Sequence, residues 1–141
     1  MRFAWPADIE EAEDGISVSF PDIPGAITFG STRAEALERA SDALASLISA
    51  MIENGEPVPT ASEAAGRPLV SLAPLDAAKI ALHMAMVEHG VSNVELGRKL
   101  GLTEKAVRRL VDPLHQSKIE KVDAALRILG KRLEIAVAEA A

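Results

Sequence analysis

The sequence contains no cysteine, which excludes disulfide bonds and thiolate metal sites. It also lacks a long apolar run. The longest uncharged apolar stretch, residues 43–52, is too short to span a bilayer, for which about 20 residues are needed. Residues 1–15 show no basic segment followed by an apolar one, so no signal peptide is expected. We therefore expect a cytoplasmic protein that has no membrane partner.

Histidines are few, and no glycine-rich phosphate-binding loop is present. His83, His89 and His115 are scattered without the spacing of metal ligands or of a catalytic triad. His83 and His89 are expected to pack in or cap their helix, whereas His115 lies in a loop from which it could touch a phosphate. The sequence therefore predicts no catalytic residue, no metal site and no cofactor.

The net charge of −6 is unevenly distributed along the chain. Residues 1–66 carry three basic and twelve acidic side chains, a net charge of −9, whereas residues 67–141 carry twelve basic and nine acidic ones, a net charge of +3. Such an asymmetry suggests a different partner for each half, and the alternative is two solvated surfaces without partners. A length of 141 residues fits one mid-sized domain or two small ones.

The first half alternates apolar and polar residues as strands do. Strands are expected over residues 1–9 and 16–20, with a charged turn over 10–15 between them. In the stretch SFPDIPGAITFG, residues 21–25 have the chemistry of a proline–glycine turn, and residues 26–29 predict a returning strand. The large apolar side chains of this stretch are expected to pack in the core or the hairpin, namely Phe20, Ile23 and Phe29.

A helix is expected from Thr32 to a stop at Gly55, because Thr32-Arg33-Ala34-Glu35 matches a capping box and apolar residues recur at helical spacing. Residues 57–68 are rich in proline, alanine, serine and threonine and indicate a connector. A short strand over 69–72 can rejoin the sheet. Residues 1–72 therefore predict an α+β domain with a three- to four-stranded antiparallel sheet and one helix.

The second half, residues 75–141, changes to helical periodicity and predicts an all-α domain. Its helices are expected to end at Gly90, Gly101, Asp112 and Gly130. Residues 131–137 then alternate like a strand, which needs a partner edge and so suggests dimerisation with a symmetry mate. The alternative is that this segment continues as helix or frays.

The segment NVELGRKLGLTEKAVRRL, residues 93–110, predicts two short helices joined by a glycine-containing turn, which is the feature of a helix-turn-helix. Ser92 and Thr103 can cap the starts of these two helices. Gly97 is small where the two helices approach, and Gly101 lies in the turn. The polar residues expected to face outward could reach phosphates and base edges of DNA. These candidate DNA-binding residues are Ser92, Asn93, Thr103, Glu104, Lys105, Arg108, Arg109 and Lys118. The alternative is the solvated basic face of an ordinary helical bundle.

Two family resemblances follow from these motifs. The segment 93–110 resembles the Cro/C1-type helix-turn-helix, whose domains usually bind DNA as dimers. The stretches SFPDIPG, GSTRAEAL and GEPVP, in this order and followed by the closing GKRLEI, resemble the HicB antitoxin family over nearly the whole chain.

The resemblance to HicB antitoxins implies an N-terminal domain similar to a reduced RNase H fold, which binds a HicA-like toxin that cleaves mRNA. It also implies a C-terminal domain that binds operator DNA and represses the antitoxin's own operon, in a homodimer or tetramer. An acidic first half fits this expectation, because a toxin that binds RNA should present a basic surface.

Two other functions stay open from the sequence. One is a stand-alone transcription regulator whose N-terminal domain binds a ligand or another protein. The other is a metal-dependent nuclease that uses acidic residues such as Asp14 and Asp22, since such chemistry needs several carboxylates that converge on metal ions.

Overall fold

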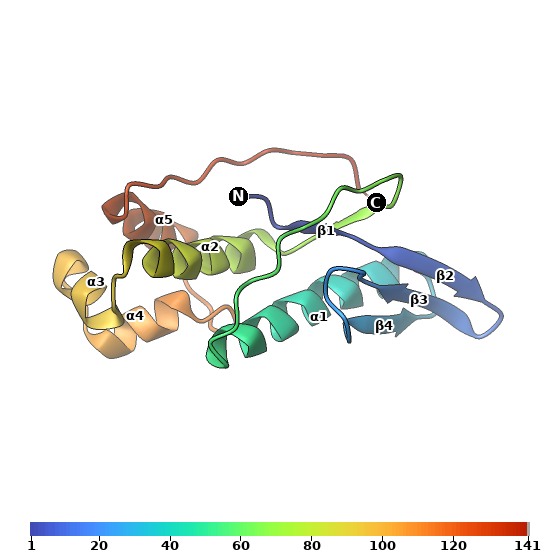
Figure 1. Cartoon of the computed structure of the whole chain (residues 1–141), viewed down its shortest axis with the longest axis horizontal. Coiled ribbons are helices and arrows are strands. Elements are labelled where there is room, and N and C mark those ends of the chain that lie inside the picture. Colours follow the sequence, from blue (N-terminus) through green and yellow to red (C-terminus); the bar gives the residue numbers. More distant parts are fainter. Residues whose placement is uncertain (141) are drawn as a thin grey trace. The chain divides into compact units, whose positions relative to one another are not determined.

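A computed structural model of the chain describes residues 1–140 (Figure 1). The chain divides into two compact units. Met1–Ala73 form the N-terminal unit described below, and Pro74–Ala138 form the C-terminal unit. Within the described residues, no helix is both long and apolar enough to cross a membrane.

The strands of the N-terminal unit form two small antiparallel sheets. In one sheet, β1 (Ala4–Pro6) pairs with β5 (Leu69–Ser71). In the other, the order is β2 (Asp8–Ala12), β3 (Gly15–Ser19) and β4 (Ile27–Gly30). The antiparallel α+β character predicted from the sequence is therefore confirmed. The single three- to four-stranded sheet is not, because the five strands form two sheets and β5 pairs with β1 instead of rejoining the larger sheet.

The strand predicted over residues 1–9 is instead two strands, which are separated at Ala7. The backbone N–H of Ala7 donates to the carbonyl of Pro68, at 3.0 Å. The turn predicted over residues 10–15 was also too long. The β2–β3 pairing continues to Ala12 opposite Gly15, so only Glu13 and Asp14 remain in the turn.

The stretch SFPDIPGAITFG forms the strand, turn and returning strand that were predicted. Gly25 has a φ of 93°, which favours glycine. Phe20 and Ile23 are buried as expected. Phe29 is not, because it lies on the face of β4 opposite α1 and is 66% exposed.

Helix α1 (Arg33–Glu53) covers one face of β3 and β4 (Figure 1). The predicted cap is confirmed, since the Thr32 hydroxyl accepts a hydrogen bond from the Glu35 backbone N–H at 3.2 Å. Gly30 allows the helix to approach the sheet closely, because a Cβ at this position would lie 2.5 Å from the backbone nitrogen of Ala36. The buried stripe of α1 contains Ala36, Ala40, Leu44 and Ile48.

The connector over residues 57–68 has no strand or helix, but side chains fix it to the N-terminal unit at three points. The Trp5 indole N–H donates to the carbonyl of Pro59 at 3.2 Å. Asp22 accepts hydrogen bonds from the backbone and hydroxyl of Ser62, at 2.9 and 3.0 Å. Arg67 forms an ion pair of 2.7 Å with Asp8.

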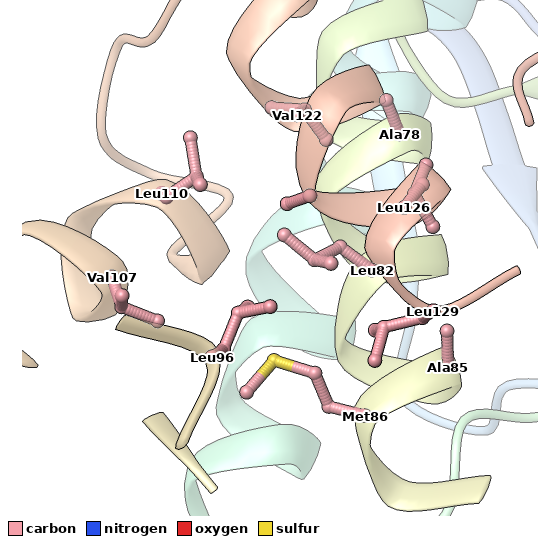
Figure 2. Packing of buried hydrophobic residues seen from close by; sticks show 11 residues of the cluster. Ala78, Leu82, Ala85, Met86, Leu96, Val107, Leu110, Val122, Leu126 and Leu129 are labelled. Atoms are coloured by element: carbon pink, nitrogen blue, oxygen red, sulfur yellow. The ribbon is translucent and has the colours of Figure 1, made fainter. Parts of the chain in front are cut away.

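The C-terminal unit contains four helices: α2 (Pro74–His89), α3 (Asn93–Leu100), α4 (Glu104–Val111) and α5 (Ile119–Ile128). All four pack around one apolar cluster, which Figure 2 shows from close by. The cluster includes Leu82, Leu96, Val107, Leu110, Val122 and Leu126. The helices predicted for this half are thus present.

The strand predicted over residues 131–137 is not formed within the single chain. Leu133 packs against the helical core, and its backbone N–H donates to Asp123 at 3.2 Å. Beyond it, Ile135 and Val137 are 82% and 97% exposed. A strand needs the backbone groups of a neighbouring strand, and no strand of the C-terminal unit as described supplies them.

Candidate nucleic-acid interface

Gly101 and the cap residue Thr103 fix the turn between α3 and α4, and a second cap residue, Ser92, fixes the start of α3. Gly101 ends α3 in the left-handed region, at φ 70°. The Ser92 hydroxyl accepts from the Glu95 N–H at 3.1 Å, and the Thr103 hydroxyl accepts from the Ala106 N–H at 3.2 Å. The two helices therefore begin and end where the sequence predicted, for the predicted local reasons.

Gly97 is the point of closest approach between α3 and the turn. A Cβ there would lie 2.6 Å from the backbone oxygen of Leu102 and 3.4 Å from Cγ2 of Val107. The Leu102 N–H donates to the Gly97 carbonyl at 2.8 Å, which holds this approach in place. The side chains of Leu96 and Val107 are fully buried beside it.

The polar face of α4 is open to solvent, as expected. All five of its candidate residues are exposed, namely Thr103, Glu104, Lys105, Arg108 and Arg109. Arg108 forms an ion pair of 2.8 Å with Glu104 one turn before it. Such an exposed pair stabilises little, so Arg108 can exchange it for a phosphate or a base. Lys105 and Arg109 form no ion pair among the described residues.

The other candidate residues lie at helix starts. Ser92 is the exposed cap of α3, and Asn93, half-buried, begins that helix. Lys118 is exposed at the start of α5 and makes no side-chain cap hydrogen bond. The hydroxyls of Ser92 and Thr103 therefore have a structural role as caps, whatever else they contact.

Sequence reasoning missed Lys79, whose side chain forms hydrogen bonds with the end of α4. This lysine of α2 is fully buried. Its Nζ donates to the carbonyls of Arg109 at 3.0 Å, Asp112 at 2.9 Å and His115, and to the Ser117 hydroxyl at 2.8 Å. One ammonium group thus binds a carbonyl of the last turn of α4, the carbonyl of the cap residue Asp112 and two groups of the loop that follows, which fixes the end of the basic helix.

Burial lowers the pKa of Lys79, and the nearby carboxylates of Asp112 and Asp76 oppose this shift. The sequence hints at this role of Lys79 in one way only, since a lysine stands next to Ala78 within the apolar stretch of α2.

Burial also lowers the pKa of His83, which is half-buried on the same helix. His115 contributes its backbone carbonyl, and its side chain is exposed.

The acidic residues Asp8, Asp14 and Asp22 have separate surroundings. Asp8 is paired with Arg67, Asp22 is bonded to Ser62, and Asp14 lies in the β2–β3 turn. In the part of the chain that the structure describes, no group of three or more potential ligand side chains could hold a metal ion.

Comparison with known proteins gives concordant matches. Residues 3–81 match the family described as the HicB_like antitoxin of bacterial toxin-antitoxin systems. The chain is 40% identical over 131 residues to antitoxin HicB 2 of Photorhabdus laumondii subsp. laumondii, which covers 93% of this chain and 94% of that protein. It is 37% identical over 139 residues to antitoxin HicB of Pseudomonas fluorescens, with 97% and 95% covered.

Among solved structures, the chain is similar to one in a HicA3 and HicB3 toxin-antitoxin complex. The two are 31% identical, the match covers 43% of this chain and 71% of that one, and the TM-score is 0.39.

Proposed function

The chain belongs to the HicB-like antitoxin family of bacterial toxin–antitoxin systems, and on this premise we propose two activities for it. The N-terminal unit binds and neutralises a HicA-like mRNA-cleaving toxin. The C-terminal unit binds operator DNA and represses the antitoxin's own operon. The observation that carries the second activity is the α3–turn–α4 pair with the exposed side chains of Lys105, Arg108 and Arg109.

Toxin binding is supported by the acidic N-terminal half, in which residues 1–66 have a net charge of −9. A protein that cleaves RNA needs a basic surface to attract phosphates. Opposite charges steer two such proteins together and select against wrong partners. An antitoxin that covers this basic surface keeps RNA away from the toxin.

Operator binding is supported by how α4 is held. The side chains of Val107 and Leu110 pack the inner face of α4 into the core. Lys79 donates to the carbonyls of Arg109 in the last turn of α4 and of the cap residue Asp112. The exposed face is thereby presented as a rigid recognition helix of a helix-turn-helix. Arginine can read guanine bidentately in the major groove, whereas lysine mainly attracts phosphates.

Dimerisation is part of the same proposal, because paired recognition helices bind paired half-sites. The segment after Leu133 is exposed, and Ile135 and Val137 project apolar side chains from it. Antiparallel pairing of this segment with the same segment of a second copy would satisfy both backbones and cover these side chains. Such pairing would form a homodimer, from which a tetramer could be built.

The experiment that tests the proposal is co-expression of the full chain with a small HicA-like protein, sought in the reading frame beside its gene. Rescue of growth and co-purification of the two proteins are expected. Purified antitoxin should also retard DNA from its own promoter region and not an unrelated fragment of equal length. A chain that retards the DNA but neither rescues growth nor binds the neighbour would instead be a stand-alone transcription regulator.

A further inference from the structure

The three-stranded sheet of the N-terminal unit has one face covered by α1 and one face open. Residues paired across antiparallel strands point to the same face. Val18 pairs with Thr28, and the Thr28 hydroxyl donates to the carbonyl of Ala36 on α1 at 3.4 Å. Val18 is fully buried, so this face is the one that α1 covers (Figure 1).

The opposite face carries acidic side chains on β2, serines on β3 and large apolar side chains on β4. In one row Glu10 pairs with Ser17, which pairs with Phe29. We call this surface the open face, and its residues are Asp8, Glu10, Ser17, Ser19, Ile27 and Phe29. Ile27 is 57% and Phe29 is 66% exposed, although both lie within a strand. Two large apolar side chains together on an uncovered sheet face indicate an interaction surface.

A hollow of about 320 Å³ adjoins Phe29 on the surface. Its lining residues include Glu10, Glu11, Asp14 and Arg39. Arg39 is already engaged, because its guanidinium pairs with Glu35 at 2.6 Å and donates to the carbonyl of Phe29 at 2.9 Å.

The carboxylates around this hollow are unpaired. Across the ion pairs of residues 1–140, none contains Glu10, Glu11 or Asp14. Glu10 lies on the open face in the cross-strand row of Phe29, whereas Glu11 pairs with Ile16 and points to the other face. A cationic side chain bound on the open face would therefore find the carboxylate of Glu10 in that row.

We propose that the open face is the surface on which the toxin docks. The toxin would place a lysine or arginine side chain in the hollow and apolar side chains against Ile27 and Phe29. This inference rests on the proposed function, which supplies a basic, RNA-binding partner. It goes further because it assigns the face and the residues that make the contact, and it explains neutralisation as occupation of the toxin's basic surface.

The negative charge of the open face favours a basic protein as its partner over a second copy of this chain or a nucleic acid. A second copy of this chain would bring a second Glu10, from a half with a net charge of −9, toward the first, and like charges across an interface disfavour association. Nucleic acid is disfavoured by the same carboxylates, because its affinity for proteins comes largely from neutralised phosphates.

The test measures binding of the full chain to its neighbouring toxin by calorimetry, with two variants of the open face. Phe29→Ser removes the exposed ring, and Glu10→Lys reverses one charge beside the hollow. Each is expected to weaken binding roughly tenfold or more, as for central contacts of an interface. Both sites are exposed, so an unchanged melting temperature is expected and shows that each variant is folded.

Two control variants match these changes away from the open face. Val87→Ser removes an apolar side chain from α2 that is 67% exposed, close to the 66% of Phe29. Glu63→Lys makes the same charge change in the exposed connector. Both controls should bind the toxin like the unmodified chain.

The outcomes separate this inference from the proposed function. If the unmodified chain binds the toxin and all four variants bind it equally well, the assignment of the open face as the docking surface is refuted, whereas the antitoxin function stands. If the unmodified chain does not bind the toxin, the proposed function fails and this inference fails with it. If Phe29→Ser lowers the mass in light scattering without weakening toxin binding, the face belongs to a second copy and the inference is overturned.

Discussion

Gly97 lies directly against the carbonyl oxygen of Leu102, so closely that a Cβ at Gly97 would be 2.6 Å from that oxygen. Helix propensity alone predicts that Gly97→Ala stabilises the protein by about 0.5–1 kcal/mol. The contact predicts the opposite sign, because the backbone of the turn must move. We expect a loss of about 1–3 kcal/mol in the free energy of unfolding, measured with urea. Lys99→Ala, an exposed change on the same helix, is the control, and a more stable Gly97→Ala variant would contradict the geometry.

The buried Lys79 should matter for both stability and DNA affinity. Lys79→Met keeps the stem but removes the donor for three carbonyls and a hydroxyl. Unmade hydrogen bonds of buried groups cost about 1–3 kcal/mol, which is the expected decrease in the free energy of unfolding. DNA binding should also weaken, because the end of α4 loses its anchor. Lys121→Met, at an exposed position of α5, should leave stability unchanged, and equal stability of the two variants would argue against this role.

Stability should decrease as the pH falls below the ordinary pKa of histidine. Burial lowers the pKa of His83, so between the lowered value and 6.5 the unfolded chain binds more protons than the folded one. The free energy of unfolding therefore rises with pH across this window and is progressively lost on acidification. Urea unfolding between pH 5 and 8 measures the slope. His83→Gln should flatten it, and an unchanged slope in that variant would assign the effect to another group.

The segment after Leu133 should control the oligomeric state. Truncation should begin at Glu134, because Leu133 packs in the core and Lys131 forms an ion pair of 3.1 Å with Glu88. We expect the truncated chain to shift toward the monomer in light scattering. Ile135→Pro should do the same, because proline cannot donate a backbone hydrogen bond to a partner strand. Ile135→Thr keeps that donor and should preserve the mass of the unmodified chain. An unaltered mass after truncation would show that dimers form elsewhere.

Local chemistry predicted much of the fold. The caps at Thr32, Ser92 and Thr103 and the glycine at the end of α3 act within a few residues, so the sequence displays them directly. The break at Ala7 was not predictable, because it depends on the carbonyl of Pro68. A pattern of alternating residues along one strand does not reveal a partner so distant in the chain.

In the candidate site too, features set by nearby residues were predicted and features set by distant residues were missed. The exposed basic face of α4 follows from helical periodicity and was predicted residue by residue. Lys79 was missed because its acceptors lie 30 to 38 residues away. Phe29 was expected to be packed, since alternation alone does not tell which face of a sheet a helix will cover. That its face is open became clear only from the register that pairs Phe29 with Ser17.

The two activities proposed here should separate genetically, and one variant tests this most directly. Lys105→Ala, Arg108→Ala and Arg109→Ala together remove the three cations of α4, all of which are exposed. We expect affinity for promoter DNA to fall about 100-fold or more in mobility-shift assays, since each lost contact costs about 1–3 kcal/mol. Toxin binding and growth rescue should stay at the level of the unmodified chain. DNA affinity that is unchanged in this triple variant would contradict the assignment of α3 and α4 as the operator-binding element.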